Sequence, residues 1–428
     1  MSEAAAALSP LAADELQTGC LVIGAGIVGL SAAWRLRQAG HEVLLIDRSG
    51  IAAEASAGNA GACAYSDIQP LASPGILRQA PKWLLDPLGP LALPPRYLAQ
   101  ITPWLWRFWR ASRPAQVRAS TQAQASLMQL AAAAMPRLVQ SVGAQALLHT
   151  DGNLQLYESQ AEWRAALPGW ALRQAHGIAF EHLQGASAIA QWQPGLSEAL
   201  VAATFVPGWQ RIDDPLALAV AVARAFSAAG GRLRLAQAQA LRPGARGVQV
   251  VLADGRSVLA QQVLVAAGAW SHRLAATLGD RLPLETERGY NTTLPAGAFA
   301  LRRQLTFGGH GFVVTPIGGG VRVGGAVELG GLNAAPNYQR ADAMLAKAKR
   351  FLPTLRTAGG TRWMGFRPSL PDSLPVIGRA PADARVIYAF GHGHLGLTQA
   401  AATAELVTTL AGGQTPTVDL KPFRAQRF

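Results

Sequence analysis

The stretch from Leu21 to Asp47, LVIGAGIVGLSAAWRLRQAGHEVLLID, constrains the fold of this chain more than any other. It contains a short apolar run, a glycine-rich turn, apolar residues at helical spacing and a second apolar run. This order predicts a strand, a tight turn, a helix and a parallel strand, which together form the βαβ unit that binds a dinucleotide. We therefore expect a Rossmann-like domain that begins near residue 20.

The glycine spacing has a separate physical use at each position. Gly24 permits the tight turn out of the strand, Gly26 lets a pyrophosphate approach the backbone, and Gly29 lets the helix lie close to the strand. The helix would begin at Ile27 and Val28, whose N–H groups and positive dipole end favour phosphate. A lone GxGxxG is weak evidence, but the full strand–helix–strand context makes a dinucleotide site the favoured interpretation.

Asp47 ends the second apolar run, 23 residues after Gly24. This is about where the acid that bonds the adenosine ribose belongs. We place Asp47 and the adjacent Arg48 in the predicted cofactor site.

Composition limits the other classes of protein. The chain has 428 residues, enough for two or three domain-sized units. Charged residues make up 15% of it, and no apolar run is long enough to span a membrane. Two cysteines give no disulfide framework, so we expect a reducing, cytoplasmic location. Residues 1–19 have no basic n-region or long apolar core, and we expect a flexible extension there.

The formal net charge of +13 comes from scattered arginines, and no nucleic-acid motif accompanies it, so we expect no nucleic-acid partner. Thr102-Pro103 has the composition of a helix start, and Trp104 to Arg113 then mixes tryptophans with arginines. One interpretation is an interfacial helix on an anionic bilayer. The favoured alternative is a helix packed on its own domain with its arginines outward.

A run of small residues, EASAGNAG, occupies positions 54–61. It resembles the EASxxNAG loop of the D-amino-acid dehydrogenase branch of the D-amino-acid oxidase-like FAD-dependent oxidoreductases. The resemblance implies that the loop lies along the flavin, and it places Ser56, Asn59, Ala60 and Gly61 in the cofactor site. For Cys63, just beyond the loop, a free thiol is favoured over a covalent flavin link.

The stretch WMGFRPSLPDSLPVIG, residues 363–378, is rigid and non-helical because of its prolines and glycines. Arg367 stands in an apolar aromatic setting and requires an anion, since an unpaired buried guanidinium is costly. In the resembled family the arginine of this WxGxRP motif grips the substrate α-carboxylate, with Gly365 at the flavin. The structural alternative is an ion pair with Asp372.

The stretch GHGHLGLTQ, residues 391–399, follows a predicted strand and precedes an Ala-rich helix. Its helix N-terminus favours negative charge. In the resembled family this loop surrounds the flavin ring, and the strand that ends near residue 267 closes the flavin domain beside the dinucleotide. The implied cofactor residues are Ala267, Gly268, Gly391, Gly393, His394, Leu395, Gly396, Leu397 and Thr398. His392 and His394 have no third ligand cluster, so we expect no metal.

Residues 283–351 are β-rich, and the resemblance places them on the sheet of a substrate domain that faces the flavin. Tyr290 either caps a substrate pocket there or is a buried sheet tyrosine. The predicted catalytic residues are Arg367, Tyr290 and His394.

The predicted fold class is α/β with an α+β substrate part: a Rossmann-like FAD-binding domain and a discontinuous mixed-sheet substrate domain. We assign residues 20–72, 200–280 and 363–428 to the FAD domain, and 73–199 and 281–362 to the substrate domain.

The resemblance implies FAD as cofactor and oxidative deamination of a D-amino or cyclic D-imino acid, with hydride transfer from Cα to flavin N5. Electrons would pass to a quinone or other respiratory carrier, with the protein cytoplasmic or peripheral on the inner membrane face. The GHGHLGLTQA ending also resembles D-hydroxyproline dehydrogenases, so D-proline and cis-4-hydroxy-D-proline are the leading substrates. Two departures bear on this: Asp47 stands where the family often has Glu, and Ala62 where the dehydrogenases often have Gln.

Three alternatives remain open. A glycine- or sarcosine-type oxidase would use O2, an NAD-dependent dehydrogenase would share only residues 21–47, and a flavoprotein subunit of a larger amine dehydrogenase would bind FAD without reacting.

Overall fold

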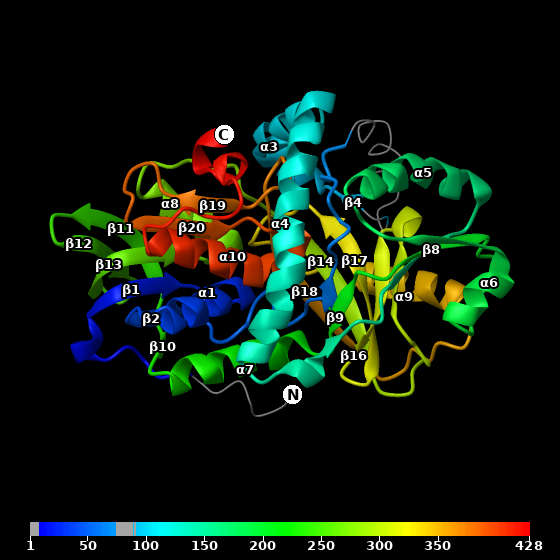
Figure 1. Cartoon of the computed structure of the whole chain (residues 1–428), viewed down its shortest axis with the longest axis horizontal. Coiled ribbons are helices and arrows are strands. Elements are labelled where there is room, and N and C mark those ends of the chain that lie inside the picture. Colours follow the sequence, from blue (N-terminus) through cyan, green and yellow to red (C-terminus); the bar gives the residue numbers. More distant parts are fainter. Residues whose placement is uncertain (1–7, 74–88, 90) are drawn as a thin grey trace.

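The computed structural model describes residues 8–73, 89 and 91–428. Two large sheets form its two halves, and helix α4 (Pro114–Ser141) runs between them in Figure 1. The predicted α/β class with a Rossmann-like domain and a second, mixed sheet is confirmed.

The first sheet is built around the predicted βαβ unit. Strand β1 pairs in parallel with β2, and helix α1 connects them. Strand β13 pairs in parallel with β1 on its other side, and its C-terminal half also pairs with β20. The strands are β10 (Arg232–Leu235), β2 (Val43–Asp47), β1 (Gln17–Ile23), β13 (Ser257–Val265), β12 (Gly247–Leu252) and β11 (Ala238–Gly244), with β20 (Val386–Phe390) and β19 (Val376–Arg379) beside β13.

Helices cover one face of this sheet. In Figure 1, α1 and α10 lie in front of the strands, and α1 also contacts α7 while α10 contacts α4. Their apolar sides share one core with the strands, because the sheet is parallel at its centre and must be buried on its faces. The helices are α1 (Ile27–Gln38), α7 (Pro215–Ala228) and α10 (Gly396–Ala411); the short α8 (Ser271–Ala276) packs near β11.

The second sheet is mixed and carries the cavity wall described below. Helix α9 (Gln339–Phe351) covers its other face at β14 and β17. Its strands, in order, are β18 (Thr361–Ser369), β14 (Glu285–Leu294), β17 (Gly320–Glu328), β16 (Phe312–Ile317), β15 (Gln304–Phe307), β6 (Asn153–Tyr157), β8 (Ala202–Val206) and β7 (Glu181–Gln184), with β4 (Leu91–Ala92) beside β17.

Smaller elements complete the described chain. Strands β3 (Ala62–Cys63), β9 (Gln210–Ile212) and β5 (Leu148–His149) form a third small sheet. Helices α5 (Gln160–Ala175) and α6 (Gly185–Trp192) lie beside β6–β8, and α3 (Leu98–Ala111) precedes α4. Within the described ranges, none of the helices combines the length and the hydropathy that crossing a bilayer requires.

The structure differs from the sequence analysis in three places. Residues 8–19 are not a loose extension: Leu11 is buried, and residues 17–19 already belong to β1. Helix α3 begins at Leu98 rather than Thr102, because the 3₁₀ turn at 95–97 leads directly into it and the Thr102 hydroxyl donates back to the Leu98 carbonyl. Strands β8 and β18, which we assigned to the FAD domain, pair in the second sheet.

Candidate active site

The turn after β1 depends on glycine for two reasons. Gly24 has φ +112°, and a Cβ there would lie 2.4 Å from the Ala266 carbonyl oxygen at the end of β13. A Cβ at Gly29 would lie 1.9 Å from the Gly24 carbonyl oxygen, so only glycine lets α1 begin against the strand. The predicted uses of Gly24 and Gly29 therefore have a direct steric basis.

Asp47 lies at the end of β2 beside this turn. Its Oδ2 accepts from the Ala25 N–H (2.8 Å), and its Oδ1 accepts from the N–H groups of Ser49 (2.7 Å) and Gly50 (3.0 Å). A carboxylate offers about four acceptor sites, so Oδ2 keeps one for a ribose hydroxyl. Backbone donors thus fix the orientation of the Asp47 carboxylate.

The loop at 54–61 joins the two halves of the molecule. The Ser56 hydroxyl accepts from the Ile27 N–H (3.0 Å) at the start of α1. On the other side, Asn291 Nδ2 donates to the Gly58 carbonyl (2.8 Å), and the Arg322 guanidinium donates to the Asn59 carbonyl. The loop is therefore fixed between the dinucleotide turn and the second sheet.

Gly58 is required by a close aromatic contact, since a Cβ there would lie 2.2 Å from the Trp363 ring. Trp363 lies on β18, in register with Asn291 of β14. Two neighbouring strands of the second sheet thus press on the same loop residue.

The 391–398 loop closes the other end of the site. The Thr398 hydroxyl accepts from the Ala64 N–H (3.1 Å) and donates to the Ala62 carbonyl (3.2 Å), which ties α10 to the segment after the 54–61 loop. His392 is buried and bonds to Thr403 Oγ1 (3.0 Å); burial lowers its pKa to about 3. His392 is thus a neutral structural residue of the loop.

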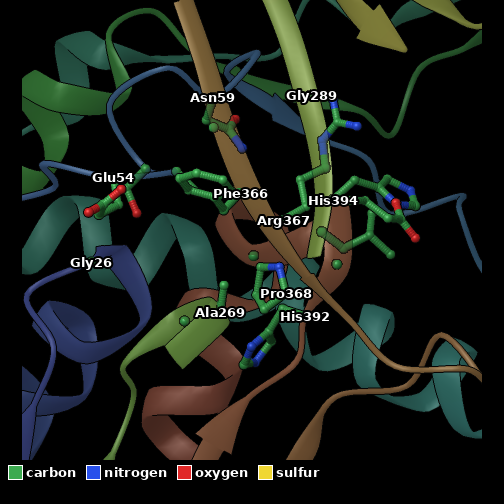
Figure 2. Close-up of a pocket in the computed structure, with 18 of the residues that line it drawn as sticks. Gly26, Glu54, Asn59, Ala269, Gly289, Phe366, Arg367, Pro368, His392 and His394 are labelled. Carbon is green, nitrogen blue, oxygen red and sulfur yellow. The ribbon is translucent and has the colours of Figure 1, made fainter. Parts of the chain in front are cut away.

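These segments surround a cavity of about 1310 Å³, shown in part in Figure 2. Most predicted cofactor residues line it, including Gly26, Asp47, Asn59, Gly268 and Thr398. Three predicted cofactor residues do not line the cavity: Gly29, Gly61 and Gly391. The glycine cradle, the N-termini of α1 and α10 and the elongated lining fit a dinucleotide.

Arg367 lies in the cavity wall, on β18. Its guanidinium crosses Gly289 of β14, where a Cβ would lie 2.3 Å from Arg367 Cζ (Figure 2). Nη1 donates to the Ala326 carbonyl (2.8 Å) and Nη2 to the Gly325 carbonyl (3.3 Å). These carbonyls belong to a bulge of β17, where Ala326 has φ +54°. Sheet and bulge together hold the side chain in place.

The charge of Arg367 has no carboxylate at ion-pair distance in the described part of the chain. Asp372, the alternative partner, instead pairs with Arg427 (2.7 Å). Burial lowers the pKa of Arg367, and its cross-strand neighbour Glu287 opposes that effect. Arg367 is therefore a cation that borders the cavity, with the acid Glu287 on the neighbouring strand but no ion pair within the described ranges.

Glu287 is a buried acid that the sequence analysis missed. It lines the cavity opposite Arg367 on β14 and accepts from the Ser369 hydroxyl (2.6 Å). Burial raises the pKa of Glu287. Arg322, which also lines the cavity, was missed as well, because its place is set by strand pairing rather than by a local motif.

His394 faces the cavity close to Arg367, and its Nε2 lies 4.0 Å from Asp67 Oδ2. Burial in the wall and the Arg367 charge lower the pKa of His394 to about 4. The imidazole is therefore neutral at physiological pH.

Tyr290 also lines the cavity, but its hydroxyl is already hydrogen-bonded within the second sheet and its neighbouring loop. Its hydroxyl donates to Glu328 and accepts from the Asn337 N–H (3.1 Å), and its ring belongs to the core under α9. In the described part of the chain, no hydrogen bond joins this hydroxyl to Arg367 or His394, so its place as a substrate cap stays a prediction.

Cys63 is a buried free thiol, and burial raises its pKa to about 12, which disfavours the thiolate. No cluster of three or more metal-ligating side chains occurs in the portion of the chain that the structure describes.

Comparison with known proteins gives the same picture of the whole chain. A family model described as FAD dependent oxidoreductase (DAO) matches residues 20–410. A D-amino-acid oxidase of Bradyrhizobium diazoefficiens is 36% identical over 417 residues, covering 95% of this chain and 98% of that protein. A D-amino acid dehydrogenase of Rhizobium johnstonii is 29% identical over 415 residues, covering 95% and 99%.

Among solved structures, glycine oxidase from Geobacillus kaustophilus superposes with a TM-score of 0.78 at 20% identity, covering 96% of this chain and 99% of that chain. At this identity the likeness concerns the fold.

Proposed function

The chain belongs to the DAO family of FAD dependent oxidoreductases, and on that premise we propose that it oxidises a D-amino or cyclic D-imino acid. The family makes FAD the cofactor, in place of the NAD alternative. The proposal rests on one observation: Arg367 borders the cavity that the dinucleotide turn and the 391–398 loop line, and among the described residues its guanidinium bonds only to backbone carbonyls.

Arg367 would bind the α-carboxylate of the substrate. Two of its five N–H donors are used by the carbonyls of Gly325 and Ala326, and the other three remain for a carboxylate fork. The neutral His394 beside it adds no competing charge. A substrate anchored there would present its Cα–H to the cofactor in a fixed orientation.

FAD, when bound, accepts the hydride that leaves Cα. The substrate nitrogen must be neutral as the hydride leaves, so its extra proton is lost first. The product is an imino acid, to which water adds outside the site. The protein's part is to orient the substrate and enclose it, since the cofactor carries the redox chemistry.

The substrate and acceptor are proposals from the resemblance of the 391–400 stretch. The leading substrates are D-proline and cis-4-hydroxy-D-proline, with electrons passed to a quinone or other respiratory carrier. The main alternative is a glycine- or sarcosine-type oxidase that uses O2, and a non-reacting flavoprotein subunit is the other.

An anaerobic visible spectrum of the purified protein tests the function. We expect a yellow protein that bleaches with cis-4-hydroxy-D-proline, D-proline or D-alanine and reoxidises slowly in air. Rapid reoxidation with peroxide would make it an oxidase. A yellow protein that no amino acid bleaches would refute the proposed activity and favour the subunit.

We propose further that α3 contacts the face of an anionic membrane from the cytoplasm. Trp104 of this helix is buried and stacks on Phe108 (5.1 Å between ring centroids), whereas Trp106 and Trp109 are 51% and 43% exposed. Arg110 lies over the Trp106 ring (4.8 Å to the centroid). Exposed indole rings with arginines suit an interface with anionic lipid.

Sedimentation with vesicles tests this contact. The protein should bind vesicles that contain anionic lipid and bind neutral ones less. The Trp106→Ser/Trp109→Ser double variant should lose this binding and retain FAD. Equal sedimentation of both proteins would remove α3 from any membrane contact.

A further inference from the structure

We propose that Asp67, with His394 beside it, is a specificity-determining residue that accepts a hydrogen bond from a hydroxyl group of the substrate beyond its α-carbon. The inference rests on the proposed function, because it concerns the same cavity and a substrate anchored at Arg367.

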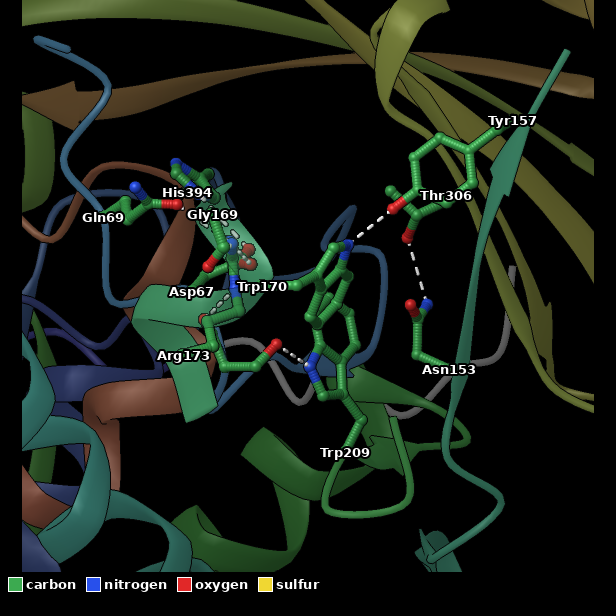
Figure 3. A network of polar contacts seen from close by, with 11 residues as sticks. Asp67, Gln69, Asn153, Tyr157, Gly169, Trp170, Arg173, Trp209, Thr306 and His394 are labelled. Carbon is green, nitrogen blue, oxygen red and sulfur yellow. Dashed lines mark hydrogen bonds and ion pairs between the residues drawn. The ribbon is translucent and has the colours of Figure 1, made fainter. Parts of the chain in front are cut away.

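Hydrogen bonds from Arg173 and Trp209 hold the residues around Asp67 in place (Figure 3). Arg173 of α5 donates through Nε to the Ser66 carbonyl (2.9 Å) and through Nη1 to Gln69 Oε1 (2.9 Å). Trp209 Nε1 donates to the Ser66 hydroxyl (2.6 Å). These bonds fix the residues on both sides of Asp67, so its carboxylate is held at the cavity wall.

The carboxylate itself lacks a hydrogen-bond donor. The basic side chains nearest to it in the described ranges are Arg173, whose Nη2 is 3.9 Å from Oδ1, and the neutral His394, whose Nε2 is 4.0 Å from Oδ2. Both distances exceed that of a hydrogen bond, and no side chain in the described ranges donates to either oxygen. The side chain is 30% exposed and borders the cavity. Its oxygens are therefore open to the cavity, and a ligand donor can bind them in place of solvent.

The donor is better supplied by a hydroxyl than by an amine. A carboxylate beside the α-amine would stabilise its protonated form, which cannot assist loss of the hydride. A cationic side chain would meet the Arg173 charge that already faces the same carboxylate. A hydroxyl is a neutral donor and suits an acid that is already partly compensated.

The surroundings fit a substrate that spans from Arg367 to Asp67. His394 lies between the two charges, since it is close enough to Arg367 for that charge to lower its pKa and is 4.0 Å from Asp67. Figure 2 shows His394 next to Arg367. Leu71, Trp209 and Leu395 supply apolar lining for the carbon skeleton. A ring with a carboxylate at one end and a hydroxyl at the other matches this sequence of groups.

The experiment compares cis-4-hydroxy-D-proline with D-proline in anaerobic stopped-flow reduction of the bound flavin. The wild type, Asp67→Asn and the control Asp342→Asn are each measured with both substrates. Asp342 is an exposed acid paired with Arg362, outside the cavity. We expect the wild type and the control to prefer the hydroxylated substrate by about 10- to 100-fold in kcat/KM. Asp67→Asn should lower that ratio by about 10-fold or more.

Each outcome separates the inference from the proposed function. If D-proline bleaches the flavin as well as its hydroxylated form does in the wild type, the inference is wrong and the function stands, whether or not the variant folds. An equal loss with both substrates in Asp67→Asn would give Asp67 a structural or amine-directed role instead. A wild-type preference for D-lysine over D-norleucine that Asp67→Asn loses would identify an ammonium donor and overturn the hydroxyl assignment. Absence of bleaching with every D-amino acid would refute both proposals.

Discussion

Replacement of Arg367 by lysine tests the carboxylate anchor most directly. The wild-type guanidinium uses one N–H on each terminal nitrogen for the carbonyls of Ala326 and Gly325, and three donors remain. A lysine has three N–H groups on one nitrogen, so after two carbonyl bonds only one can reach a substrate. The fork is lost, but the positive charge beside Glu287 is kept.

The expected loss is that of about one hydrogen bond to a charged group, ~1.5–3 kcal/mol. It corresponds to a decrease of roughly 10- to 150-fold in kcat/KM for flavin reduction. Alanine at this position should cost about 100-fold or more, because the charge is lost as well.

Anaerobic stopped-flow reduction with D-proline or D-alanine measures the effect, and the flavin-to-protein absorbance ratio shows whether the variant still binds FAD. Arg362→Lys is the matched control, because Arg362 lies on the same strand but pairs with Asp342 at the surface (3.2 Å). It should react like the wild type. An Arg367→Lys protein that retains its full FAD content and has wild-type kcat/KM would refute the role of Arg367 as carboxylate anchor.

Three further perturbations test the site and its surroundings. Gly29→Ala should abolish or severely weaken FAD retention, because its Cβ would lie 1.9 Å from the Gly24 carbonyl oxygen. The flavin-to-protein absorbance ratio measures this loss, and the control Gly208→Ala, where a Cβ would meet no atom within 4 Å, should retain FAD. Gly289→Ala should displace the Arg367 guanidinium and lower kcat/KM about 10-fold or more while FAD stays bound, and unchanged kinetics would contradict the packing described here. His392 has its folded pKa lowered to about 3, so the unfolded chain binds the proton first and stability falls as the pH drops from about 6.5 toward 3, by up to ~1.4 kcal/mol per pH unit. Denaturant unfolding of His392→Asn should show a shallower acid loss than the wild type, and an identical slope would exclude this residue as a source of the acid sensitivity.

Much of the fold could be predicted because its signals are local. The segment from Leu21 to Asp47 forms the end of β1, helix α1 and strand β2, where the glycine spacing and the apolar runs predicted a strand, a helix and a strand. Helix α3 shows the limit of this method. Thr102-Pro103 has the composition of a helix start, but the preceding 3₁₀ turn leads into a helix that begins four residues earlier, at Leu98, and Pro103 lies inside that helix.

Helix α3 also shows why the sequence allowed two interpretations, an interfacial helix and a helix packed on its own domain. Periodicity assigns some of its tryptophans to a buried face and others to an exposed one, but not what either face contacts. In the structure Trp104 faces inward and Trp106 outward, so packing on the domain accounts for one face and leaves the other for a partner.

By itself the sequence determined the dinucleotide unit, the family and FAD, because the glycine spacing and the WxGxRP and GHGHLGLT motifs act within single contiguous segments. It also identified Arg367 as a cation in need of an anion. Only the tertiary structure decided what surrounds that cation. Asp372 forms an ion pair with Arg427 instead. The guanidinium of Arg367 crosses Gly289 and donates to a carbonyl in the bulge of β17.

The position of the Asp67 carboxylate at the cavity wall likewise could not be predicted from the sequence. It depends on Arg173, more than 100 residues away along the chain, which bonds to Ser66 and Gln69 but lies 3.9 Å from the Asp67 carboxylate, beyond hydrogen-bond distance. Such an arrangement leaves no periodic or motif signal, because strand register and helix docking, not neighbouring residues, set the distances between these side chains.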